Sequence, residues 1–83
     1  MISDTTKAKI AQFGCAMLEQ LGRNEHKGDW ERWTPEDTEL MREIRNHIDA
    51  LDRALLTRDG DAIAKHSTAI ANFCMKTVEV YGS

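Results

Sequence analysis

The feature that most restricts the fold is a line of apolar residues spaced alternately three and four positions apart. They are Met41, Ile44, Ile48, Leu51 and Leu55. This spacing keeps the side chains on one side of an α-helix and is close to the heptad pattern of helices that pack against another helix. Thr34 and Pro35 precede it as the expected N-cap and first helical residue. The pattern predicts a long helix that needs a helical neighbour.

Two further segments have the same helical period. The first runs from about Asp4 to Leu21, and its apolar residues on one side are Ile10, Phe13, Met17 and Leu21. Ser3, Asp4 or Thr5 can cap its start, and Gly22 is expected to end it. The other carries Ile63, Ile70, Cys74, Val78 and Tyr81 and ends at Gly82. A short polar turn, 58–61, separates it from the middle helix, so these two helices should form an antiparallel hairpin.

The predicted fold class is therefore all-α, with three helices in one domain that spans residues 1–83. A domain of this length buries roughly 60% of its unfolded surface, so it gains much stability from self-association. Because three helices leave an apolar edge uncovered, we expect two hairpins to pair into a four-helix-bundle homodimer.

Charge and composition exclude several classes of partner. The chain has 11 Lys and Arg against 14 Asp and Glu, a net charge of −3, and both signs are mixed throughout. Nucleic-acid binding needs clustered basic residues, and a membrane span needs about 18 consecutive apolar residues. We therefore expect no nucleic-acid or membrane partner. Cys15 and Cys74 lie inside apolar helical patterns, which predicts buried, reduced thiols in a cytoplasmic protein.

The segment 24–30 contains an amide, an imidazole, an ammonium and an indole side chain together with a glycine. Such a set suits a nucleotide base and phosphate, since the indole can stack and the cation can pair. The competing interpretation is that the tryptophans fold back onto the core while the lysine is solvated. The candidate binding residues, for a nucleotide or a partner, are Asn24, His26, Lys27, Trp30, Trp33 and Asn72.

His47 and His66 lie on the two hairpin helices and could approach one another. Glu43 is one turn before His47, so the three could hold a divalent transition metal. The competing interpretation is that they are partly exposed polar residues beside the core.

Five segments of the chain match a known family: they are Asn24-Glu25-His26-Lys27-Gly28-Asp29-Trp30, Thr34-Pro35, Leu51-Asp52-Arg53-Ala54-Leu55, Ile70-Ala71-Asn72-Phe73 and Tyr81-Gly82. With them the chain resembles the short MazG-like proteins of phage and prophage genomes, which are all-α relatives of nucleoside triphosphate pyrophosphohydrolases. This resemblance extends from Phe13 to Gly82. It implies a helical fold that assembles as dimers or as dimers of dimers.

The same resemblance shows a departure at the catalytic positions. Active relatives carry a Glu-Glu-x-x-Glu set and a Glu-x-x-Asp set, whose carboxylates hold magnesium against the triphosphate. In this chain these positions are occupied by Asn46, His47, Ala50, His66 and Ala69. No carboxylate remains among the five, which implies a protein without catalytic residues, metal or cofactor.

The resemblance thus predicts a catalytically inactive MazG-like protein, phage-encoded and located in the host cytoplasm. It would bind a host protein as an inhibitor or modulator of a host system such as a defence complex. One alternative is a nucleotide sensor that uses Lys27, Trp30 and Asn72. Another is a pyrophosphohydrolase whose metal site is rebuilt from His47, His66 and acids such as Glu43 and Asp49, which would favour manganese or zinc.

Overall fold

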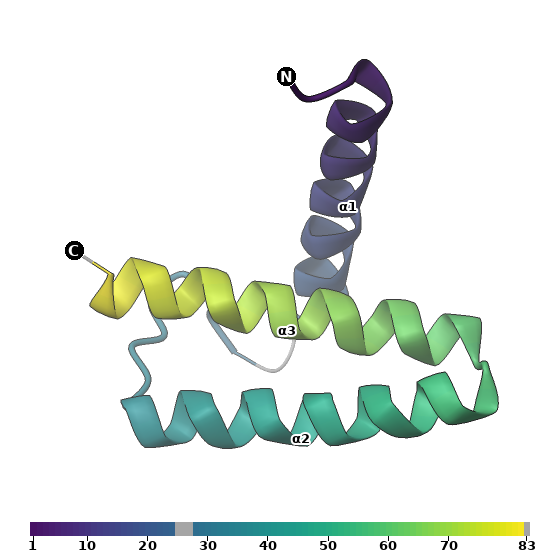
Figure 1. The fold of residues 1–83 in the computed structure, drawn as a ribbon. Coiled ribbons are helices and arrows are strands. Elements are labelled where there is room, and N and C mark those ends of the chain that lie inside the picture. Colours follow the sequence, from purple (N-terminus) through teal and green to yellow (C-terminus); the bar gives the residue numbers. More distant parts are fainter. Residues whose placement is uncertain (25–27, 83) are drawn as a thin grey trace.

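The computed structural model describes residues 1–24 and 28–82. This described part of the chain contains three α-helices: α1 (Asp4–Arg23), α2 (Asp37–Thr57) and α3 (Gly60–Tyr81). In these residues there is no strand, and the predicted all-α class is confirmed. The helices α2 and α3 run side by side as an antiparallel hairpin, while α1 stands on α3 and its N-terminal end points away from the hairpin (Figure 1).

The start of α1 agrees with the sequence, and its end does not. The Ser3 hydroxyl accepts a hydrogen bond from the Thr6 N–H at 3.2 Å, as expected for an N-cap. Gly22 does not stop the helix, which continues to Arg23 with Asn24 as its C-cap. The Asn24 side chain stabilises the last turn, since its Nδ2 donates to the Gln20 carbonyl at 3.1 Å.

The predicted start of α2 at Thr34 and Pro35 is wrong. The helix begins at Asp37, with Glu36 as an N-cap that makes no side-chain bond. The cause lies far away in the chain, because the Tyr81 hydroxyl donates to the Pro35 carbonyl at 2.8 Å. This contact holds Pro35 as the last part of the loop against the C-terminal end of α3.

The turn between α2 and α3 is shorter than the predicted 58–61. Arg58 ends α2 in the left-handed region, with a φ of 55°. Asp59 then caps α3, because its side chain accepts from the Ala62 N–H at 3.2 Å. The third helix therefore begins at Gly60, before the predicted apolar line, and it ends at Tyr81 with Gly82 as C-cap, as predicted.

The apolar residues of α2, which include Leu40 and Ala54 beside the predicted line, lie on two edges of the helix. Leu40, Ile44 and Ala54 are buried and Leu51 is half-buried, whereas Met41, Ile48 and Leu55 remain 42%, 49% and 42% exposed. The helix thus presents one edge to α3 and a second apolar edge to solvent.

The prediction of buried cysteines is wrong, because both thiols are exposed. Cys15 belongs to a part of α1 in which residues 4–15 are all exposed, and Cys74 lies on the side of α3 opposite the buried Asn72. Among the described residues, no helix is both long and apolar enough to cross a membrane.

Candidate functional site

A cleft of about 1250 Å³ lies between the end of α1, the loop that leads to α2, and one side of the hairpin. Of the predicted candidates, Asn24, Trp30, Trp33, Asn72, His47, His66 and Ala69 line this cleft. Asn46 and Ala50 are not part of its described lining, while His26 and Lys27 lie outside the described residues. The structure therefore brings the loop candidates and the histidine pair to one place.

A buried pair of amides ties α1 to α3 at one side of the cleft. Asn72, which is 2% exposed, donates through Nδ2 to the Met17 carbonyl at 3.1 Å and to Oε1 of Gln20 at 2.9 Å. Nε2 of Gln20 in turn donates to the Lys65 carbonyl at 3.0 Å. Both amides face backbone carbonyls, so their NH₂ groups must point as described. Oδ1 of Asn72 is left buried with no partner in the described part of the chain.

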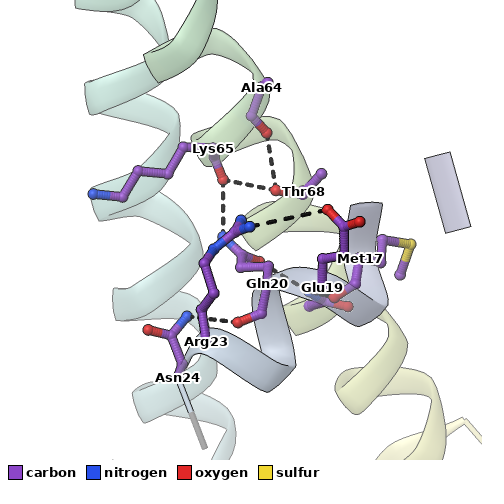
Figure 2. A network of polar contacts seen from close by, with 9 residues as sticks. Met17, Glu19, Gln20, Arg23, Asn24, Ala64, Lys65 and Thr68 are labelled. Carbon is purple, nitrogen blue, oxygen red and sulfur yellow. Dashed lines mark hydrogen bonds and ion pairs between the residues drawn. The ribbon is translucent and has the colours of Figure 1, made fainter. Parts of the chain in front are cut away.

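Figure 2 shows the polar contacts around Gln20 at the end of α1. The Thr68 hydroxyl donates back to the carbonyls of Ala64 and Lys65, at 2.9 and 3.0 Å. The Lys65 carbonyl thus accepts from both Thr68 and Gln20. Gln20 is not among the predicted site residues, because a glutamine next to Leu21 is ordinarily solvated.

The two tryptophans pack on the hairpin, as the competing interpretation of the loop expects. Their ring centroids lie 5.4 Å apart, and those of Trp30 and Trp33 lie 5.9 and 6.0 Å from the ring of Phe73. The His47 ring is 5.6 Å from Phe73 and continues the cluster. These spacings are typical of favourable aromatic pairs. Both indoles remain half-buried, and they form one wall of the cleft.

Lys76 anchors this loop and was not predicted. Its side chain is fully buried, its Nζ donates to the Trp30 carbonyl at 2.8 Å, and the same ammonium lies 5.1 Å from the centre of the Trp30 ring. Glu79 completes an ion pair at 3.3 Å. A buried lysine is rare without such partners. No local signal identifies it, since Trp30 lies 46 positions away.

The predicted approach of the two histidines is confirmed. Nδ1 of His47 and Nδ1 of His66 are 2.9 Å apart, a distance that requires one nitrogen to carry a proton and the other to accept it. The pKa of His47 is lowered from 6.5, first by burial and then by the neighbouring His66. Lys65 lowers this pKa further and Glu43 raises it.

The acids named for a rebuilt metal site do not gather. Glu43 lines the cleft beside His47, whereas Asp49 is exposed and is not part of the lining. Among the described residues, no group of three or more His, Cys, Asp or Glu side chains is placed to hold a metal ion.

The described cleft lining carries more negative than positive side chains. The acids are Asp29, whose carboxylate pairs with Arg32 at 3.3 Å, and Glu31, Glu39 and Glu43. Lys65 is the sole lysine or arginine among the described lining residues. Since charges in a concave site focus the field, such a lining attracts cations and opposes anions.

Comparison with known proteins finds no family model, no curated protein and no solved structure that matches the chain. The MazG-like resemblance therefore remains a prediction that depends on the residues quoted above.

Proposed function

We propose that this chain is a catalytically inactive MazG-like protein that acts by binding a protein partner. In this proposal it is the phage-encoded inhibitor or modulator of a host system that the resemblance implies. The observation that carries the binding role is the charge of the described cleft lining, in which four acids, one of them paired with Arg32, outnumber one lysine beside two indoles. A polyphosphate would be repelled by this lining, whereas a lysine or arginine side chain of a partner would pair with the acids and stack on the rings.

The absence of catalysis is proposed from the residues at the family's metal positions. His47 and His66 are neutral or cationic groups and contact each other, and Ala69 beside them is buried and has no ligand atom. Magnesium prefers hard oxygen ligands, which neither side chain supplies.

The binding proposal is tested with a short blocked peptide that carries one central arginine. Citrulline in place of arginine keeps the shape and removes the charge. We expect saturable changes in tryptophan emission with the arginine peptide and at least about ten-fold weaker binding of the citrulline peptide. Glu43→Gln should weaken binding. The matched variant Asp49→Asn changes an acid on the same helix outside the cleft and should leave binding unchanged. Equal binding of both peptides, or none at millimolar concentration, contradicts the proposal.

The catalytic proposal is tested by pyrophosphate release. Ribonucleoside and deoxynucleoside triphosphates are offered with magnesium and then with manganese, and we expect no turnover. Turnover that disappears with EDTA and in both His47→Ala and His66→Ala would contradict inactivity and would establish the rebuilt metal site instead.

Nucleotide binding without hydrolysis is the second candidate, and the aromatic wall of the cleft favours it. A base could stack on Trp30 or Trp33 while Lys65 pairs with a phosphate. The distinguishing variant is Lys65→Glu, which should weaken nucleotide binding by about ten-fold or more. Arg53→Glu makes the same charge change on an exposed residue outside the described lining and should have little effect. Saturable nucleotide binding with this dependence would replace the protein-partner proposal.

We also propose that two copies pair through their hairpins as a homodimer with a four-helix bundle. The support is the second apolar edge of α2, in which Met41, Ile48 and Leu55 are each more than two-fifths exposed. Covering such an edge removes apolar area from water and stabilises a small domain.

A further inference from the structure

The hairpin has an outer face, turned away from the cleft, and it is apolar on both helices. On α2, the buried line of Leu40, Ile44 and Ala54 separates the cleft acids Glu39 and Glu43 from the exposed edge. On α3 the outer residues lie on the side opposite Asn72, which bonds α1. The outer face consists of Met41, Ile48 and Leu55 of α2 together with Ile63, Ile70 and Cys74 of α3.

The α2 part of this face is bordered by charges in a fixed order. Arg45 lies between Met41 and Ile48 along the helix, and Asp52 lies between Ile48 and Leu55, both on the solvent side of the apolar edge and both exposed. Farther round the helix, Arg42 and Asp49 repeat the order. The N-terminal half of this border is therefore basic and the C-terminal half acidic, with Ile48 at the change of sign.

We infer that the outer face binds a second copy of this chain with the two α2 helices antiparallel and crossing at Ile48. This inference rests on the homodimer proposed above and specifies its interface. A two-fold axis at Ile48 places Met41 against Leu55 of the partner subunit. It also places Arg45 beside Asp52 of the partner subunit, once on each side of the axis. A parallel pairing would set Arg45 against Arg45 and Asp52 against Asp52, so charge complementarity selects the antiparallel register.

The experiment is a charge exchange followed by sedimentation equilibrium. Arg45→Asp alone, or Asp52→Arg alone, turns both symmetric pairs into like-charge contacts and should raise the dimer dissociation constant by about ten-fold. The double variant Arg45→Asp with Asp52→Arg restores opposite charges, and its dissociation constant should return to within about three-fold of the wild type. High salt should reduce the effect of each single change.

Ile48→Asp tests the apolar centre of the same interface. It should give monomers, because two carboxylates would meet at the axis in an apolar contact. Ile48 is 49% exposed, so the fold should persist, and far-UV circular dichroism checks this. The matched control is Ile10→Asp, the same change on an α1 residue that is 65% exposed, and it should remain dimeric.

The outcomes separate the interface from the homodimer. A wild-type chain that is monomeric at high micromolar concentration overturns both. A dimer that survives Ile48→Asp, or dissociates with Ile10→Asp instead, leaves the homodimer and overturns this interface. A double charge variant as weak as the single variants overturns the antiparallel register.

Discussion

The two sides of the hairpin are built from different kinds of contact. On the cleft side, Asn72 and Lys76 are almost completely buried and are held by hydrogen bonds of 2.8 to 3.1 Å to α1 and to the loop. On the outer face, Ile48 and its neighbours on α2 are about half exposed and make no polar contact that fixes a partner. Hydrogen bonds are directional, whereas apolar contact is not.

This difference assigns different tasks to the two sides. The buried amides and the buried ammonium admit one placement of α1 and of the loop, because any other placement leaves a polar group unpaired. Burying the apolar outer face stabilises the association of two copies, and the charges at its border are needed to favour one relative orientation of the copies. We therefore expect changes on the cleft side to alter the stability of the monomer, and changes on the outer face to alter its assembly.

The largest effect is expected from Asn72→Asp. The replacement has the same shape but puts an oxygen where Nδ2 donates to Oε1 of Gln20 and to the Met17 carbonyl. An uncompensated buried charge costs about 4 kcal/mol, which urea denaturation would report. Asn46→Asp makes the same change at an exposed position of α2, and its free energy of unfolding should stay within about 0.5 kcal/mol of the wild-type value. Equal stabilities of the two variants would show that the amide pair does not specify the fold.

The next largest effect is expected from Ile44→Ala, compared with Ile48→Ala, and it distinguishes the buried edge of α2 from its exposed edge. Ile44 is 8% exposed and Ile48 is 49% exposed. Ile44→Ala should therefore lower the free energy of unfolding by about 3 kcal/mol at any protein concentration. Ile48→Ala should lower it by less than about 1 kcal/mol in dilute solution, and by more at concentrations where the dimer forms. Thermal midpoints measured over a range of concentrations would check this. If the midpoint of Ile44→Ala, rather than that of Ile48→Ala, changed with concentration relative to the wild type, the assignment of the edges would be reversed.

A smaller effect is expected from Lys76→Met, which keeps an unbranched side chain one atom shorter than lysine and removes the ammonium and its charge. The Trp30 carbonyl loses its donor, and an unpaired buried acceptor costs about 2 kcal/mol. Tryptophan emission should shift as well, because the loop loses its anchor. Lys65→Met, at an exposed position of the same helix, is the control. A Lys76→Met chain as stable as the wild type would mean that burying the ammonium costs as much as its contacts contribute.

The parts of the fold that the sequence predicts are those fixed by local chemistry. The Ser3 cap, the end of α3 at Gly82 and the antiparallel hairpin follow from nearby residues and from periodicity. The boundary at Pro35 does not, because it depends on a hydroxyl that is 46 positions away. Helix ends held by tertiary contacts cannot be located from their own residues.

The sequence predicts some residues of the candidate site and not others, for the same reason. The approach of His47 and His66 follows from the hairpin, since the two residues lie at facing positions of antiparallel helices. The roles of Gln20 and Lys76 do not follow, because each is polar and pairs with a distant backbone carbonyl. Glutamine and lysine side chains are ordinarily exposed to solvent. Their burial becomes favourable once the chain has brought those carbonyls close.

The smallest effect concerns pH and the histidine pair. Burial, followed by the charge of His66, lowers the pKa of His47 in the folded chain below the unfolded value of 6.5. Protons therefore bind the unfolded chain more readily, and the stability contributed by neutral His47 is fully present above about pH 6.5 and is lost as the pH falls toward the lower folded pKa. Thermal midpoints from about pH 7.5 to about 5.5 should decrease for the wild type. His47→Gln should remove most of this decrease, and His66→Gln should remove a smaller part, because His47 would remain buried. If His66→Gln removed the whole decrease, the charge of the neighbour rather than burial would be the main cause.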